Sequence, residues 1–344
     1  LRRERDLGLA DPAGFATQKL FGADISPQAC DFAAFAVLHE IIGEVTTPPQ
    51  LIWQAIRTNL VALDALSLLE TRGGRAGLRR NFPRLSGPIR LICNPPYAGA
   101  AGNSVQLDGA PVRSLYLPFV EMAWRLADGP EDASCLVVPL ALGANTTADH
   151  RRTRASLAAA GGRWTMLFFD RQPHALFGEE AKTRATIAIR RAGPKAANIW
   201  TSGLLKWTSR QRASILSEGR AVDLGTPRIT RLVPKLTSDD AVQLYRDLSE
   251  YRLSRPDRPR IEKAAPSEIV GTALSNDVFV GATAYNFLNI FRNYPDHLSW
   301  RGELSSSGIH KLRFGSAVDA SVATALLSSR VAFWLWHTEC DGFH

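Results

Sequence analysis

The tetrapeptide Asn94-Pro95-Pro96-Tyr97 combines residue types and spacing that can carry out chemistry. It directly follows residues 89–93, an apolar run with the length and composition of a β-strand. Two successive prolines fix the main chain and remove two N–H donors, which leaves carbonyl groups directed outward. The side-chain oxygen of Asn94 and the carbonyl oxygen of Pro95 can then accept both hydrogens of one amino group. Tyr97 adds a flat face against which a planar ring can stack.

Two acceptors of this kind matter for an amino group on an aromatic ring, which is a poor nucleophile. Its lone pair is delocalised into the ring, and accepting both hydrogens favours a pyramidal nitrogen that can attack an electrophilic carbon. A Pro-Pro tetrapeptide also occurs by chance as an ordinary turn, so the motif alone leaves both interpretations open.

Acidic residues end two earlier strand-like runs. Residues 19–25 form an apolar run that ends at Asp24, and residues 59–63 form another that is followed by Asp64. Taken singly, either acid is as readily a helix cap or an exposed turn residue. Their order along the chain, ahead of Asn94, favours a site at the carboxyl ends of three strands.

The order of these three motifs resembles that of amino-group methyltransferases, above all the S-adenosylmethionine-dependent DNA adenine-N6 methyltransferases. The resemblance implies that Asn94, Pro95, Pro96 and Tyr97 form the catalytic motif. The electrophile is then the methyl sulfonium of the cofactor, and the target adenine is extruded from the duplex to stack on Tyr97.

The resemblance also implies the residues that bind S-adenosyl-L-methionine. Asp24 and its neighbour Ile25 are expected at the cofactor ribose, where the acid accepts hydrogen bonds from the hydroxyl groups. Asp64 and its neighbour Ala65 are expected at the amino group of the cofactor's adenine.

Other segments agree with the strand order of this family. Residues 135–139 resemble its fifth strand, and residues 168–170 and 186–189 resemble its final strand pair. Phe177 lies in the loop between that pair, where an aromatic residue borders the flipped base in some relatives. Packing of Phe177 in the core is the alternative.

The cofactor loop of the family, an Asp/Asn-Pro-x-x-Gly-x-Gly run after the first strand, has no counterpart in this sequence. Residues 11–15 are superficially similar but lie too close to Asp24, and we predict an ordinary loop there. In this family the first strand occupies the middle of the sheet, so its loss leaves two interior edges without partners. We expect a fragment of a longer protein, or another polypeptide that supplies the strand and the glycine loop.

Alternating strand-like and helix-like runs predict a Rossmann-like α/β methyltransferase sheet, mostly parallel with an antiparallel last strand and helices on both faces. The predicted strands are residues 19–25, 59–63, 89–93, 134–142, 164–169 and 185–189, and the predicted helices are residues 28–42, 114–126 and 148–160.

We assign residues 1–195 to a methyltransferase catalytic domain that is truncated at its N-terminus. Residues 196–344 are assigned to a linker and a mixed DNA target-recognition region, which need not be complete. Within it, Ser238 is the expected N-cap of a helix at Asp239–Leu253, and residues 254–260 resemble a connector. An apolar helix is predicted at residues 321–336. Residues 332–336, followed by residues 341–344, resemble the recognition region of large, fused restriction and phage-defence methyltransferases.

The net charge of +8 is concentrated in residues 151–235, which hold seventeen Lys or Arg and five Asp or Glu. Such a block is typical of a polyanion-binding face, because phosphate contacts release counterions. We expect Arg151, Arg152 and Arg154 to contact DNA phosphates. The alternatives are that they cap a helix or belong to an ordinary solvated surface.

The composition is that of a globular protein, with 45% hydrophobic and 22% charged residues. Cys30, Cys93, Cys135 and Cys340 are scattered without CxxC spacing, which predicts reduced thiols and no bound metal. No apolar run reaches bilayer length and no signal segment opens the chain, so we expect a cytoplasmic protein.

The function implied is methyl transfer from S-adenosyl-L-methionine to adenine N6 in double-stranded DNA, within a restriction-modification or phage-defence system. An RNA or protein-glutamine methyltransferase can share the tetrapeptide, although the long basic extension argues against it. A non-catalytic DNA-binding or specificity subunit derived from a methyltransferase is favoured by the missing glycine loop and disfavoured by the intact tetrapeptide.

Overall fold

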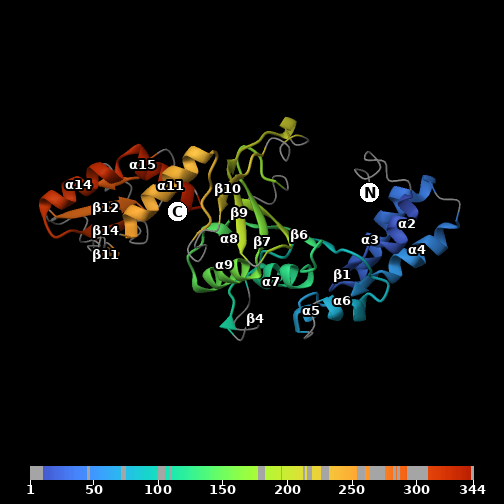
Figure 1. The fold of residues 1–344 in the computed structure, drawn as a ribbon. Helices are drawn as coiled ribbons and strands as arrows, with labels where there is room; N and C mark the ends of the chain where they lie inside the picture. The colour runs from blue at the N-terminus through green and yellow to red at the C-terminus, as the bar shows by residue number, and fades with distance from the viewer. Residues whose placement is uncertain are drawn as a thin grey trace. The chain divides into compact units, whose positions relative to one another are not determined.

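The structure is a computed structural model that divides into two compact units. Unit 1 comprises residues 1–137, 159–163 and 188–197, and unit 2 comprises residues 138–158, 164–187 and 198–344. The elements are labelled as in Figure 1. The structure describes residues 11–44, 47–70, 75–99, 105–107, 110–176, 183–194, 196–211, 214, 219–225, 232–253, 260–263, 276–281, 284, 287–292 and 309–341.

The first part of unit 1 is a pair of short parallel strands covered by helices. The elements are α2 (Pro12–Gln18), β1 (Gly22–Asp24), α3 (Pro27–Ile41), η1 (Ile42–Glu44), α4 (Pro49–Thr58) and β2 (Leu60–Ala62). Ser26 caps α3 by accepting a 3.3 Å hydrogen bond from Ala29 N, and Pro27 occupies the first turn. The buried face of α3 packs on α4, and its members are Cys30, Ala34, Leu38 and Ile41 with Ile52 and Ile56.

The loop predicted at residues 11–15 is wrong, because this segment begins helix α2. The Asp11 carboxylate accepts a 2.7 Å hydrogen bond from Gly14 N, and Pro12 occupies the first turn. An acid at the N-cap followed by proline is a helix start signal, and here it overrides the glycine.

The main sheet has six strands in the order β10-β9-β7-β8-β6-β3. Its strands are β3 (Arg90–Cys93), β6 (Ala133–Pro139), β7 (Gly162–Phe169), β8 (Ala185–Arg191), β9 (Ala197–Leu205) and β10 (Val222–Gly225). β3 and β6 are parallel. β8 runs antiparallel to β6, because Leu140 N donates to Arg184 O and Ala192 N donates to Asp132 O at opposite ends of the pair.

The predicted mostly parallel α/β sheet is therefore confirmed, and the sheet is larger than predicted. β9 lies beside β7, and β10 pairs with β9 in antiparallel fashion. The boundary predicted at residue 195 falls immediately before β9, so the sheet continues past it. A small hairpin, β4 (Gln106–Leu107) and β5 (Ala110–Pro111), stands apart from this sheet.

A layer of helices in unit 1 packs against strands from both sheets. The layer is α5 (Ser67–Glu70), α6 (Arg75–Asn81) and α7 (Tyr116–Leu126). Its buried side chains contact Val61 of β2 and Leu91 of β3, and these buried side chains are Leu68, Leu78, Phe82, Met122 and Leu126. One apolar cluster thus supports the strands that end in Asp24, Asp64 and Asn94.

Among its described residues, the C-terminal region of unit 2 has a separate antiparallel sheet and three helices. The sheet order is β11-β14-β12-β13. The elements are α8 (Ala141–Ala144) and η2 (Ser209–Gln211) in the earlier part of the unit, then α11 (Asp239–Leu253), β11 (Arg260–Lys263), β12 (Asp277–Gly281), β13 (Ile290–Phe291), β14 (Ile309–Arg313), α14 (Ala317–Leu327) and α15 (Arg330–Glu339). Ser238 caps α11 as predicted, since its hydroxyl accepts from Ala241 N at 3.2 Å.

The single apolar helix predicted at residues 321–336 is two helices. α14 ends before Ser328, and the chain bends by 68° into α15, whose first turn is capped by Ser329 accepting from Ala332 N. No single described helix is long and apolar enough to cross a bilayer, and only this bent pair taken together reaches that length and composition. Residues 254–259 of the predicted connector, and residues 342–344, lie outside the described part of the chain.

Candidate functional site

The tetrapeptide Asn94-Pro95-Pro96-Tyr97 forms a corner after β3, and this corner is partly accessible to solvent. Asn94 and Pro96 are exposed, Pro95 is buried and Tyr97 is half-buried. The tetrapeptide therefore leaves the carboxyl end of a parallel strand with its asparagine toward solvent and its first proline anchored in the fold.

The hydroxyl of Tyr97 ties this corner to the neighbouring strand. Its oxygen lies 3.0 Å from the carbonyl oxygen of Val137 in β6 and 3.1 Å from Asn94 Oδ1. The ring meets the buried Tyr116 of α7 edge-to-face, with centroids 6.5 Å apart and an interplanar angle of 74°. Sequence reasoning did not find Val137 or Tyr116, because their contacts depend on strand pairing and helix packing.

The Tyr97 hydroxyl and the Cys93 thiol both have raised pKa values. Burial, with a smaller contribution from the nearby Cys93, raises the pKa of Tyr97 to about 12. Burial also raises the pKa of the Cys93 thiol to about 11. At neutral pH the tyrosine is therefore a hydrogen-bond donor, and the thiol beside Asn94 is not a thiolate nucleophile.

The two predicted cofactor acids lie side by side at the ends of β1 and β2. Asp24 and Asp64 are both exposed. Each carboxylate also accepts from the backbone two residues on, Asp24 from Ser26 N at 2.8 Å and Asp64 from Leu66 N at 2.9 Å. Each acid thus stabilises its own turn while part of the carboxylate faces solvent.

Ile25 and Ala65, the residues that follow the two acids, differ in their exposure to solvent. Ile25 is 75% exposed, which is unusual for a large apolar side chain beside two acids. Ala65 is half-buried and packs against the apolar cluster under β2. Ile25 therefore offers an apolar surface next to Asp24, whereas Ala65 serves the packing of the turn.

Each of the strands β1 and β3 has one edge without a partner among the described strands, because β1 pairs only with β2 and β3 pairs only with β6. Ile92 in β3 is 82% exposed, although its neighbour Leu91 packs on the helix layer on the other face. A strand of a parallel sheet is normally covered on both faces, so one face of β3 lacks its cover.

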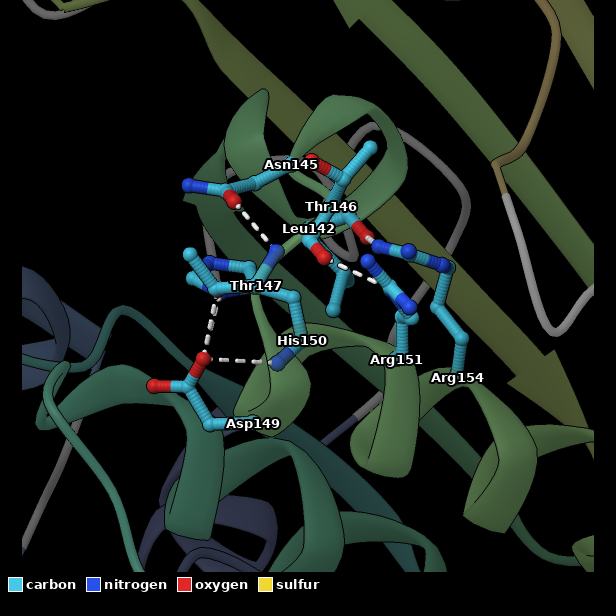
Figure 2. A network of polar contacts seen from close by, with 8 residues as sticks. All are labelled: Leu142, Asn145, Thr146, Thr147, Asp149, His150, Arg151 and Arg154. Carbon is cyan, nitrogen blue, oxygen red and sulfur yellow. Dashed lines mark hydrogen bonds and ion pairs between the residues drawn. The ribbon is translucent and has the colours of Figure 1, made fainter. Parts of the chain in front are cut away.

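A polar network begins helix α9 (Ala148–Ala160), as Figure 2 shows. The hydroxyl of Thr147 lies 2.5 Å from Asp149 Oδ1 and 2.7 Å from His150 Nδ1, and Thr147 N donates to Asn145 Oδ1 at 2.9 Å. Asp149 and His150 are buried. Burial lowers the pKa of His150, although hydrogen bonding to Asp149 opposes the shift. The network fixes the start of α9.

The three arginines predicted to contact phosphate have different surroundings. Arg151 is exposed, and its Nε donates to Thr146 O at 2.6 Å. Arg152 is half-buried. Arg154 is fully buried, and its Nη1 donates to Leu142 O at 2.9 Å (Figure 2). Arg151 therefore presents an open face to solvent, Arg152 is partly accessible, and Arg154 is used inside the fold.

Two more cations of the basic segment are also internal. Arg190 is buried and donates to the carbonyls of Ala127, Ala160 and Gly161, at the ends of α7 and α9. Lys235 is buried and its Nζ donates to Thr338 O, at the end of α15. Cations near helix C-termini satisfy the last carbonyls and the helix dipole. Part of the basic surplus is thus structural, which composition alone does not reveal. The predicted base-contacting residue Phe177 lies outside the described residues.

No protein-family model matches the chain, and no curated protein matches it. Solved structures resemble it weakly. A nuclease-deletion mutant of the Type ISP restriction-modification enzyme LlaGI, in complex with a DNA substrate mimic, is 12% identical with a TM-score of 0.46. The match covers 81% of this chain and 28% of that one.

Two further solved structures are also restriction enzymes. The ATP-dependent Type ISP restriction-modification enzyme LlaBIII bound to DNA is 14% identical with a TM-score of 0.46, covering 69% of this chain and 19% of that one. The M protein of the type I restriction enzyme EcoKI is 11% identical with a TM-score of 0.31, covering 96% of this chain and 72% of that one. At these TM-scores the functional conclusion depends on the residues of the site.

Proposed function

We propose that the protein transfers a methyl group from S-adenosyl-L-methionine to the N6 amino group of adenine in DNA, as part of a restriction-modification or phage-defence system. The observation that supports the proposal is the Asn94-Pro95-Pro96-Tyr97 corner at the carboxyl end of β3, where Asn94 and Pro96 are exposed and Tyr97 is half-buried. In this proposal the Asn94 amide, the Pro95 carbonyl and the Tyr97 ring supply the two acceptors and the flat face that a conjugated amine on a planar base requires.

The chemistry of the corner follows from its acceptors. Asn94 Oδ1 and Pro95 O accept the two hydrogens of the adenine amino group, which shifts the nitrogen toward a pyramidal geometry with an available lone pair. The ring of Tyr97 stacks on the extruded base and holds its plane. Because Asn94 and Pro96 are exposed, the hydrogen lost from nitrogen has a direct route to water. Bound S-adenosyl-L-methionine supplies the electrophilic methyl carbon.

The residues that would hold the nucleoside half of the cofactor are Asp24, Ile25, Asp64 and Ala65. Their fit is supported by two exposed carboxylates at the adjacent ends of β1 and β2, with the apolar surface of Ile25 beside them. A carboxylate at this edge of a parallel sheet suits ribose hydroxyls and an exocyclic amino group, since both are donors.

We also propose that further polypeptide supplies a central strand with the glycine loop. The open edges of β1 and β3 and the uncovered Ile92 support this proposal. A strand inserted there would pair with both edges, and the helix after it would cover Ile92. The methionine half of the cofactor would then meet N–H groups of the added loop.

The proposed partner is double-stranded DNA, and the proposed location is the cytoplasm. Arg151 and Arg152 are the candidates for phosphate contact, and the region after residue 195 is the proposed target-recognition region. The second antiparallel sheet with α14 and α15 gives that region a core of its own.

Parallel transfer assays test the proposal. The protein with its further polypeptide is incubated with tritiated cofactor and with DNA, RNA or release-factor protein. We expect label in DNA alone. Label in RNA or in release factor would select one of the rival methyltransferase activities. Tight DNA binding without any transfer would indicate a non-catalytic specificity subunit.

A further inference from the structure

The Asn94 side chain has one hydrogen-bond partner in the described part of the chain. That partner is the Tyr97 hydroxyl, 3.1 Å from Asn94 Oδ1. Asn94 is otherwise exposed, so without this contact its amide could rotate among several staggered positions. An acceptor that must meet a hydrogen of the incoming amine functions well only when its direction is fixed.

The hydroxyl is itself fixed by the neighbouring strand. Tyr97 Oη lies 3.0 Å from Val137 O, and the ring packs edge-to-face on the buried Tyr116. Val137 belongs to β6, which pairs with β3 in register from Arg90 to Cys93. The hydroxyl therefore connects the flexible amide to the rigid backbone of the sheet.

The Tyr97 hydroxyl can donate to only one of its two neighbours at a time. A tyrosine hydroxyl carries one proton, whereas the Val137 carbonyl can only accept. When the Tyr97 hydroxyl donates its proton to Val137 O, the tyrosine oxygen can only accept a hydrogen bond from Asn94. The Asn94 amide then turns its NH₂ group toward the tyrosine oxygen. This is a 180° rotation of the amide, which exchanges an oxygen and a nitrogen of similar size. Asn94 Oδ1 then faces the open side of the corner, where the substrate amine arrives.

We propose that the Tyr97 hydroxyl is a positioning group that sets the orientation of the Asn94 amide for methyl transfer. The inference rests on the proposed function and adds a second role for Tyr97. The ring stacks on the base, and the hydroxyl orients Asn94 Oδ1, the hydrogen-bond acceptor. Its raised pKa keeps the hydroxyl protonated across the neutral range, so the link persists.

The Tyr97→Phe variant separates the two roles, because it keeps the ring and removes only the hydroxyl. The first measurement is the NMR order parameter of the Asn94 side-chain amide in the selectively labelled protein, assigned through Asn94→Asp. We expect an ordered amide in the parent and a mobile one in Tyr97→Phe. Equal order in both would overturn the proposal, whatever the protein methylates.

The second measurement is single-turnover methylation of DNA by the complete protein. Freeing the amide among about six rotamers, three in χ1 and two in χ2, should lower the rate about sixfold, while the affinity for DNA stays within about twofold. An unchanged rate in Tyr97→Phe would contradict the positioning role.

These two measurements also separate the inference from the proposed function. A parent protein that transfers no methyl group to DNA, with an Asn94 amide that still loosens in Tyr97→Phe, would refute the proposed reaction and leave the hydrogen-bonded link standing. Tyr97→Ala is the comparison variant, since it removes ring and hydroxyl together and should weaken binding of the extruded base as well.

Discussion

The carbonyl oxygen of Asp24 accepts a 2.9 Å hydrogen bond from the backbone N–H of Leu63. This bond brings the ends of β1 and β2 together, so that Asp64, the residue after Leu63, lies beside Asp24. Two carboxylates from strands about 40 residues apart in the chain thereby share one sheet edge.

The first prediction concerns cofactor binding by the 344-residue chain. Its two acids can meet only the nucleoside half of S-adenosyl-L-methionine, and the glycine loop that would meet the rest is not in the sequence. We therefore expect titration calorimetry to show binding weaker than the micromolar range. Micromolar binding would mean that these residues already form a complete cofactor site.

The second prediction concerns the uncovered face of β3. Ile92 is 82% exposed, whereas Ile89, just before the strand, is buried. Ile92→Thr should change the free energy of unfolding of this chain by less than about 0.5 kcal/mol. The matched change Ile89→Thr should cost about 2 kcal/mol or more, since it leaves a cavity and a buried hydroxyl. Equal losses in urea denaturation would show that the face is already covered.

The third prediction separates the arginines of α9. Arg151→Ala should lower the salt dependence of DNA affinity by about one unit of slope and leave stability nearly unchanged. Arg154→Ala should instead destabilise the fold by about 1–3 kcal/mol, because the carbonyl of Leu142 loses its buried partner. Fluorescence anisotropy across a salt series and urea denaturation make the two measurements. An unchanged slope for Arg151→Ala would exclude it as a phosphate contact.

The fourth prediction concerns pH. Burial lowers the pKa of Lys235 from 10.5 to about 8, so between these values the unfolded chain holds a proton that the folded chain has released. Stability from this group therefore rises with pH across that window, by about 1.4 kcal/mol per unit of pKa difference at most. The Lys235→Met variant should lack this part of the pH dependence. Identical stability profiles of parent and variant between pH 8 and 10.5 would contradict it.

The sequence was sufficient for those parts of the fold that depend on local pattern. Helical periodicity predicted α3, the cap Ser238 predicted α11, and the apolar run before Asn94 predicted β3. These features need only neighbours a few residues apart. Local helix-start signals were present at Asp11 and Ser329 as well. The closeness of Asp11 to Asp24 favoured a loop in the first case, and the apolar run around Ser329 favoured a single helix in the second.

The remaining features arise from contacts between distant segments. The hydroxyl of Tyr97 reaches Val137, 40 residues away, and Arg190 reaches Ala127, 63 residues away. A count of basic residues assigns all of them to the surface, whereas Arg154 satisfies a carbonyl in the interior. The distinction between a DNA-binding cation and a structural one depends on packing, which composition does not encode.

The central claim is that Asn94 and the prolines after it activate an adenine amino group. The most direct measurement is mass spectrometry of nucleosides from DNA incubated with the complete protein and cofactor carrying a deuterated methyl group. We predict labelled N6-methyladenine for the parent and none for Asn94→Ala, with DNA affinity nearly unchanged, while the control Asn81→Ala retains activity. Equal labelling by the Asn94→Ala variant and the parent would contradict this account.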